Sequence, residues 1–305
     1  MVPKYLGEVV LQRREQLGLS QQMVCEGLCT VMTLSRFEKG LQTPSRDCVV
    51  AILQRLGLPD NRYYAQLTKK ETQLIILRKE VRACCSRFEQ STGEERQQAR
   101  VKALEKLGEL EHCIKKDDRI NRQFILGIQA TLGADPSKTR LDLQMEAIYL
   151  TSPRFDLNNL SNCLYSTSEM GIINKIAVSY SHNGQHRKSI DIYDQLLKII
   201  QKRMPNHSCL PLMAHNYAQI LRLENRLEES LDISELGLQV CIQKGHYYLV
   251  PRFLHIKAEC YYSMGAIDRS KGLYQSAYYI YEATMDTKNQ EILKIEARER
   301  LNLVL

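Results

Sequence analysis

The chain has 305 residues, of which 44% are hydrophobic and 25% charged, and it contains no Trp. This composition is ordinary for a globular protein, and the length is sufficient for two domains with separate cores. The formal net charge is +7, and residues 1–70 hold ten Lys/Arg against six Asp/Glu, a local charge of +4. More than half of the positive surplus therefore lies in the first quarter of the chain, which favours contact with nucleic-acid phosphates.

The sequence predicts neither a membrane span nor a signal peptide. No apolar run approaches the roughly 18 residues that cross a bilayer, and the start MVPKYLGEVV lacks a basic-then-apolar layout. The ten cysteines are scattered and form no C-x-x-C pair, as expected for free thiols in a reducing cytosol. Cys25 with Cys29, or Cys84 with Cys85, are the pairs that an oxidant or a metal would use. We expect a cytoplasmic protein without membrane contact.

Helical spacing predicts a first helix over residues 5–17, and the stretch from 19 to 45 then predicts two short helices joined by a tight turn. Ser20 and Thr30 are suited to cap these helices, and Gly40 stands where the second would end. Leu34 and Phe37 face inward on that second helix. Its opposite face therefore presents Val31, Met32, Thr33, Ser35 and Arg36. A further helix over 46–56 ends at Gly57-Leu58-Pro59.

Two short helices with such a turn form a helix-turn-helix, whose second helix enters the major groove of DNA. The runs L-S-Q, R-F-E-K-G and P-S resemble the five-helix DNA-binding domain of lambda-repressor and Cro-like (XRE) regulators. The resemblance implies that Arg14 pairs with Glu38. It also implies phosphate or backbone contacts for Gln21, Thr33 and Lys39, and base contacts for Val31, Met32 and Arg36. Arg36 alone can equally be a solvated surface charge.

Five more helices are expected between residues 68 and 164. Their predicted ranges are 68–90, 94–116, 120–132, 135–150 and 157–164. The long helix over 68–90 links the two domains, either as a relay or dimer element or by packing on the helices that follow it. Ser166-Thr167-Ser168-Glu169 has the pattern of a capping box, which predicts a new helix start.

Three segments then repeat one pattern. Ala177, Ala218 and Ala258 lie 41 and 40 residues apart. Each is followed at fixed offsets by matched residues, which are Tyr180, Leu221 and Tyr261; Gly184, Asn225 and Gly265; Ser189, Ser230 and Ser270; and Tyr193, Ser234 and Tyr274. The pattern resembles a divergent tetratricopeptide (TPR) repeat, a helix hairpin whose usual period is about 34 residues.

Stacked TPR hairpins form a concave wall from the first helix of each hairpin. In this register the inward positions are polar, with His, Asn, Gln and Tyr prominent rather than the Lys and Glu of a merely solvated face. The predicted ligand-contacting residues are Asn174, His182, His215, Gln219, Arg222, Arg252, His255, Glu259 and Tyr262. Their alternative interpretation is a solvated helix surface.

The domain order resembles the RRNPP family of Gram-positive regulators. The resemblance implies an all-α, homodimeric transcription regulator with a TPR-like α-solenoid that binds a short signalling peptide, and hence double-stranded DNA and a peptide as partners. We predict a DNA-binding domain over 1–66, a linker helix over 67–93 and a repeat domain over 94–305, with clear repeats starting near 172, 211 and 251. Asn174 is the clearest candidate for clamping the peptide backbone.

Two other functions remain open at this point. The repeat domain can be a scaffold that docks a protein partner, with DNA binding as its anchor and no peptide effector. An enzyme is disfavoured because no H-E-x-x-H, G-x-S-x-G or Walker loop occurs. His182, His186, His215 and His255 could in principle hold a metal, but we expect no metal and no cofactor.

Overall fold

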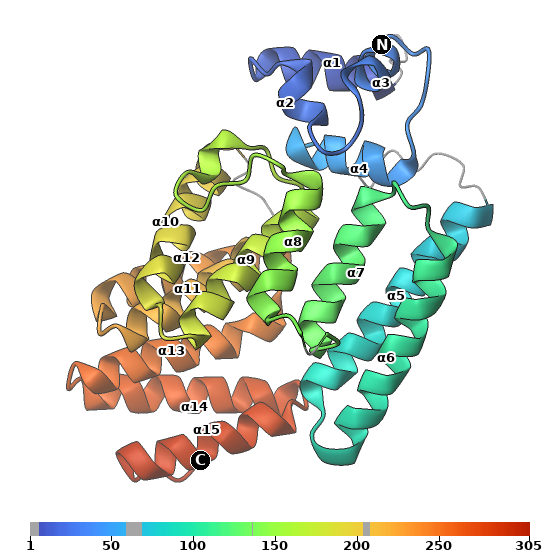
Figure 1. Cartoon of the computed structure of the whole chain (residues 1–305). Helices are drawn as coiled ribbons and strands as arrows, with labels where there is room; N and C mark the ends of the chain where they lie inside the picture. The colour runs from blue at the N-terminus through green and yellow to red at the C-terminus, as the bar shows by residue number, and fades with distance from the viewer. Residues whose placement is uncertain (1–5, 59–68, 136, 204–207) are drawn as a thin grey trace. The chain divides into compact units, whose positions relative to one another are not determined.

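The computed structural model describes residues 6–58, 69–135, 137–203 and 208–305. Within these ranges the regular structure consists of fifteen α-helices and two short 3-10 turns, which confirms the all-α prediction (Figure 1). Contacts divide the chain into two compact units, Met1–Ser179 and Tyr180–Leu305. Among the described helices, none combines the length and apolarity needed to cross a membrane.

The first unit begins with four short helices, α1 (Leu6–Gln16), α2 (Gln21–Cys25), α3 (Val31–Glu38) and α4 (Arg46–Arg55). As predicted, Ser20 and Thr30 cap α2 and α3, each accepting a hydrogen bond from a backbone N–H three residues further on. The core is a cluster that includes Val10, Leu34 and Ile52. Four helices are thus seen where five were predicted, and residues 59–68 lie outside the described residues.

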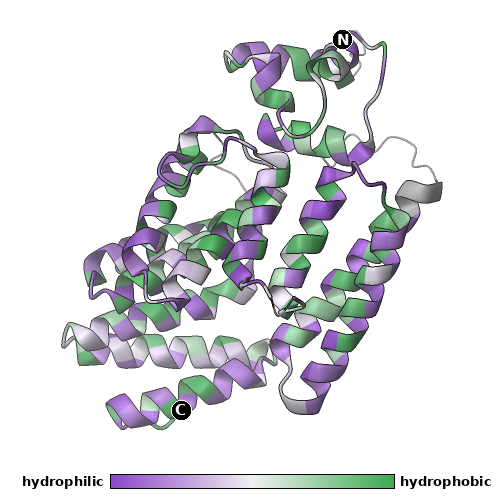
Figure 2. Ribbon diagram, viewed as in Figure 1, coloured by the Kyte–Doolittle hydropathy of each residue, from purple (hydrophilic) through white to green (hydrophobic). Residues whose placement is uncertain are grey.

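A helical hairpin and a second helix pair follow. They are α5 (Lys69–Gln90), α6 (Gly93–Cys113), α7 (Arg119–Leu132) and α8 (Arg140–Thr151). The apolar stripe of α5 packs on α6 and α7 through a cluster that includes Val81, Leu107 and Ile125, so the stripe is used within this chain. Figure 2 shows hydrophobic and hydrophilic residues alternating along these helices, as amphipathic packing requires.

Two predicted helix boundaries in this region are wrong. The helix predicted from residue 135 begins at Arg140, because Thr139 and Asp142 form a complete capping box. Asp135 instead accepts hydrogen bonds from Ser137 within a preceding turn. The helix predicted over 157–164 is reduced to the 3-10 turn η1 (Leu160–Asn162). Asp156 accepts a hydrogen bond from the Asn158 N–H at 2.9 Å, a local turn that competes with helix formation.

The start of α9 (Thr167–His182) is the predicted capping box. The Ser166 N–H donates to Glu169 Oε2 at 2.6 Å, and the Glu169 N–H donates to Ser166 Oγ at 3.4 Å. Glu169 is fully buried and also accepts hydrogen bonds from the hydroxyls of Thr151 and Ser152 and from Arg55. Burial raises the pKa of Glu169, but attraction to Arg55 and these hydrogen bonds outweigh it, so the pKa is lowered.

Arg55 links this helix start to the helix-turn-helix. Its guanidinium donates to the carbonyls of Val24 and Glu26 at 2.9 and 2.7 Å, and to Glu169 Oε1 at 2.9 Å. Gly27, in the same turn, has a φ of +72°, and a Cβ built on it would lie 1.9 Å from the Thr151 carbonyl oxygen. The turn between α2 and α3 therefore lies directly against the end of α8 in the first unit.

The second unit is a stack of helix hairpins. It contains α10 (His186–Arg203), α11 (Leu210–Leu223), α12 (Leu227–Lys244), the 3-10 turn η2 (Tyr247–Leu249), α13 (Val250–Ser263), α14 (Ile267–Ala283) and α15 (Thr287–Leu301). Successive helices pack on one another along the chain from α10 to α15. This arrangement agrees with the predicted repeat (Figure 1).

The repeated positions have one structural role each. Ala218 and Ala258 are fully buried where paired helices approach closely, and their carbonyls accept hydrogen bonds at 2.8 Å from Ser230 and Ser270, twelve residues later. The matched residues Gly184, Asn225 and Gly265 lie in the turns between helices, with φ values of 72°, 57° and 78°. This left-handed backbone explains why Asn replaces Gly there and no branched residue occurs.

Candidate functional site

The first candidate site is the exposed face of α3. Val31 and Met32 are 42% and 65% exposed, and Arg36 and Lys39 are also exposed, whereas Leu34 and Phe37 are buried in the core. An apolar side chain that is exposed at the start of a helix is not explained by packing within the chain. The face predicted for the major groove is therefore accessible in the described chain.

A polar network fixes the back of this helix. As the resemblance implied, Arg14 forms two hydrogen bonds with Glu38, at 2.6 and 3.0 Å. The bond to Glu38 raises the pKa of Arg14 against the opposing effect of burial. The Gln21 amide also donates to Glu38, at 2.6 Å, so that side chain is held inside the network. The phosphate contact of Gln21 stays a prediction, as do those of Thr33 and Lys39.

The second candidate site is a pocket of about 350 Å³ in the second unit, between α11, α13 and α15. Six of the nine predicted peptide-binding residues line it: His215, Gln219, Arg222, Arg252, His255 and Glu259. They come from two hairpins and converge because corresponding helix positions face the same side of the stack.

The floor of this pocket is a buried carboxylate. Glu259 is 3% exposed and accepts hydrogen bonds from the Tyr274 hydroxyl and from Arg300, with Arg222 at 3.4 Å. Burial and then the bond to Glu259 raise the pKa of Tyr274. Arg222 and Arg300 keep 19% and 38% of their side chains exposed, so the network is open on one side.

Two histidines, His215 and His255, also line the pocket. Burial lowers the pKa of His215 to about 4, so this ring is neutral near pH 7. His255 Nε2 lies 2.6 Å from Glu296 Oε2, an ion-pair distance without hydrogen-bond alignment. This contact is the largest cause that lowers the pKa of Glu296. Arg252 also lines the pocket, and it makes no hydrogen bond or ion pair with any residue that the structure describes.

These side chains resemble a metal site only in part. Ligand atoms of His255, Glu259 and Glu296 lie within 4.8 Å of one another. However, Arg222 and Arg300 already bind Glu259, and two guanidiniums beside a carboxylate oppose a divalent cation. The geometry therefore favours an ion-pair network over a metal centre.

Three predicted residues lie outside the pocket lining. Asn174 belongs to the first unit and is 6% exposed, His182 is exposed at the end of α9, and Tyr262 packs against the core around Tyr274. Sequence reasoning missed other lining residues, which are Ile256, Tyr281, Asn289, Ile292, Glu296 and Arg300. Ala297 was the available signal for most of them, since it is fully buried 39 residues after Ala258 and marks a fourth repeat.

Two family models match the chain. A model described as a helix-turn-helix domain matches residues 6–63, and one described as the RNPP family C-terminal domain matches residues 154–300. No curated protein sequence matches the chain.

Solved structures with the same fold were also found. PlcR of Bacillus thuringiensis, in complex with the peptide PapR7 and DNA, has a TM-score of 0.59 and 20% identity, covering 95% of this chain and 99% of PlcR. The apo form of PlcR has a TM-score of 0.59 at 18% identity, covering 94% of this chain and 98% of PlcR. ComR of Streptococcus vestibularis, in its apo form, has a TM-score of 0.53 and 14% identity, covering 96% and 97%.

Fold and sites together define a class of protein, a helix-turn-helix transcription regulator with a TPR-like repeat domain. Within this class, the chain belongs to the RRNPP family of regulators, whose C-terminal domain it contains.

Proposed function

We propose that this protein is a cytoplasmic, homodimeric regulator of transcription whose repeat domain binds a short signalling peptide that changes its affinity for an operator. The observation that supports the proposal most is the convergence of six predicted residues from two repeats on one polar pocket. PlcR, which has the same fold, has been solved with a peptide and DNA. The exposed face of α3 supports the DNA-binding half.

Charge indicates which peptide group the pocket would take. Three arginines, Arg222, Arg252 and Arg300, face two carboxylates, Glu259 and Glu296, while His215 is neutral. The excess positive charge favours a peptide carboxylate, from an acidic side chain or from the C-terminus. Arg252 is its docking point, because the other two arginines already bind Glu259.

On DNA, the dimer would place two copies of α3 in successive major grooves. Their spacing would be about 34 Å or a multiple of it, the distance of one helical turn. Peptide binding would act by favouring one arrangement of the dimer, with a coupling of about 1 to 3 kcal/mol.

The peptide half is tested with synthetic peptides encoded by small reading frames beside the gene. Binding to the full-length protein is measured by fluorescence anisotropy, and operator affinity by gel shift with and without peptide. We expect saturable binding that weakens about tenfold in Arg252→Gln, because a charge-assisted hydrogen bond is lost. The control Arg298→Gln removes an exposed arginine of α15 outside the pocket. Unchanged operator affinity at saturating peptide would refute the switch and favour a docking scaffold.

The DNA half is tested by Arg36→Ala and Lys39→Ala. If Arg36 contacts a guanine, Arg36→Ala costs about 1 to 3 kcal/mol of binding at one operator position only. Lys39→Ala is expected to weaken binding to all sequences equally, since a phosphate contact carries no base information. Equal losses on all sequences for Arg36→Ala would assign that residue to phosphate.

A further inference from the structure

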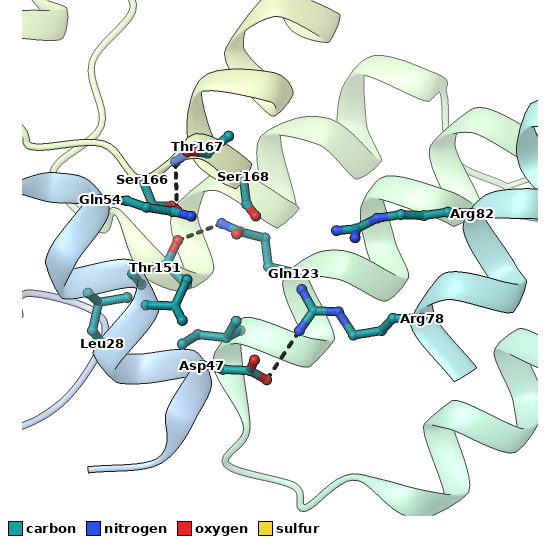
Figure 3. A pocket seen from close by; sticks show the side chains of 13 residues that line it. Leu28, Asp47, Gln54, Arg78, Arg82, Gln123, Thr151, Ser166, Thr167 and Ser168 are labelled. Carbon is teal, nitrogen blue, oxygen red and sulfur yellow. Dashed lines mark hydrogen bonds and ion pairs between the residues drawn. The ribbon is translucent and has the colours of Figure 1, made fainter. Parts of the chain in front are cut away.

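A second pocket, of about 310 Å³, lies in the first unit, away from the residues assigned above (Figure 3). It is lined by side chains of α4, α5, α7, the end of α8 and the start of α9, including Asp47, Arg78, Arg82, Gln123 and Ser168. Its volume is at the lower end of the roughly 300 to 1,000 Å³ of cavities that hold small molecules. Neither the DNA-binding face nor the peptide pocket uses it.

Two arginines give this pocket a positive charge. Arg78 and Arg82 lie one turn apart on α5, with their guanidiniums 5.0 and 5.2 Å from the Phe124 ring centre. Arg78 pairs with Asp47 at 3.1 Å, whereas Arg82 has no hydrogen bond or ion pair with any described residue. Arg82 is an exposed residue by surface area, yet desolvation beside its neighbours and then repulsion from Arg78 lower its pKa. An anion between the two guanidiniums would relieve this repulsion.

The first turn of α9 supplies a further donor. The N–H groups of Ser166, Thr167 and Glu169 are bonded to Glu169, Gln54 and Ser166, respectively. The Ser168 N–H and hydroxyl have no such bond among the described residues, and Ser168 lines the pocket (Figure 3). Free N–H groups at a helix N-terminus bind anions.

Gln123 is an independent indication that a ligand belongs here. The residue is 3% exposed, and its Nε2 donates to Ala147 and Thr151 at 3.1 and 2.5 Å. Its Oε1 accepts no hydrogen bond from a described residue, although the side chain lines the pocket (Figure 3). This oxygen is an acceptor that the pocket offers to a ligand, so the ligand should carry an O–H as well as negative charge.

We propose that this pocket binds a phosphate group, either inorganic phosphate or the monoester of a small hydroxylated metabolite. The phosphate oxygens would accept from Arg82 and the Ser168 N–H, and a P–OH or ligand hydroxyl would donate to Gln123 Oε1. Asp47 belongs to α4 of the helix-turn-helix domain. Occupancy would join α5, α7 and α9, and the Arg78–Asp47 pair ties α5 to the helix-turn-helix domain, which gives the regulator a metabolite input separate from the peptide.

Phosphate binding to the full-length protein is measured by calorimetry and thermal unfolding at constant ionic strength. Inorganic phosphate should bind saturably and raise the melting temperature of the wild type. Arg82→Gln should weaken phosphate binding about tenfold or more, because a hydrogen bond between two charged groups is lost. The control Lys79→Gln removes an exposed charge of α5 outside the pocket and should bind as the wild type does. Phosphate binding by Arg82→Gln as tight as that by the wild type would overturn the proposal.

Ser168→Asp separates ligand binding from folding. A carboxylate in the first turn of α9 stabilises the helix, so this variant should fold well and yet lose phosphate binding by repulsion. Retained phosphate binding in Ser168→Asp would contradict the proposed position of the anion. Hydrogen exchange offers a second measurement, since phosphate should slow exchange of the Ser168 amide in the wild type only.

Three probes identify the source of the phosphate. Tighter binding of glucose 6-phosphate than of inorganic phosphate would assign the site to a phosphorylated metabolite, and the reverse order to free phosphate. Sulfate lacks an O–H and should bind more weakly than the better of these two. Sulfate binding as tight as both would overturn the role of Gln123, and absence of binding by all three probes would overturn the site.

Discussion

Two buried glutamates, one in each unit, show how differently the same residue is used in this protein. Glu169 is sealed by the hydroxyls of Thr151 and Ser152, the Ser166 N–H and Arg55, and the Arg55 side chain is itself only 2% exposed. Glu259 is bound by Tyr274 and by two arginines whose side chains are 19% and 38% exposed. One network is closed on all sides and the other opens into a pocket.

The difference separates a structural role from a binding role. A network whose bonded groups are all buried can only hold segments together, and Glu169 joins α9 to the helix-turn-helix through Arg55. An open network keeps polar groups that solvent or a ligand can reach. Losing one of its hydrogen bonds lowers stability less, because water can take the place of the missing partner. Four predictions follow from this contrast.

The largest effect is expected for Glu169→Gln. The change leaves the Arg55 guanidinium buried without its counter-charge and should lower the free energy of unfolding by about 3 to 5 kcal/mol. Urea unfolding of the full-length protein measures it. The control Glu105→Gln removes an exposed carboxylate of α6 and should stay within about 0.5 kcal/mol of the wild type. Similar losses for both variants would contradict the structural role of Glu169.

Glu259→Gln should cost less, about 1 to 3 kcal/mol of unfolding free energy, because Arg222 and Arg300 can turn toward solvent. The same urea experiment compares the two glutamates directly. Glu235→Gln, which removes an exposed partner of Lys257, is the control in the second unit. A loss for Glu259→Gln as large as that for Glu169→Gln would show that the second network is closed as well.

Acid should affect the closed network in a defined pH range. The pKa of Glu169 is lowered from 4.5 in the folded chain, so its stabilisation is complete above the unfolded value and is lost as pH falls toward the folded value. Each unit of pKa difference is worth about 1.4 kcal/mol. Below pH 4.5 the wild type should therefore lose stability faster than Glu169→Gln. Parallel pH profiles from thermal unfolding would argue against a lowered pKa.

The smallest effects come from deleting one hydroxyl at each glutamate. Ser152→Ala should lower the free energy of unfolding by about 1 to 2 kcal/mol. Glu169 is fully buried, so water cannot replace the donor that is lost. Tyr274→Phe should cost less, about 0.5 to 1 kcal/mol, because the arginines remain bound to Glu259. A larger loss for Tyr274→Phe in chemical unfolding would reverse the order of the two sites.

Features that depend on local physics could be predicted from the sequence. Ser20, Thr30 and the Ser166–Glu169 capping box are set by neighbouring residues, and the inward positions of the repeats follow from helical periodicity. The boundary at residue 135 was wrong because two capping signals lie close together, and only the one at Thr139 is complete.

Features that depend on distant segments could not be predicted. The bond between Arg55 and Glu169 joins residues 114 positions apart, and no local pattern marks it. The contribution of α15 to the pocket between α11, α13 and α15 was missed because this segment retains only Ala297 of the repeated pattern. The phosphate pocket likewise combines five helices, which are α4, α5, α7, α8 and α9.

Gly27 limits which residues can occupy the turn between α2 and α3. Its backbone lies so near the Thr151 carbonyl that even a methyl group would overlap it, and its φ of +72° disfavours any other residue. A substitution there would therefore push the DNA-binding turn off the end of α8 without touching the α3 face. Sequence drift at this single position would therefore shift α3 relative to α8 while the exposed residues of α3 stayed the same.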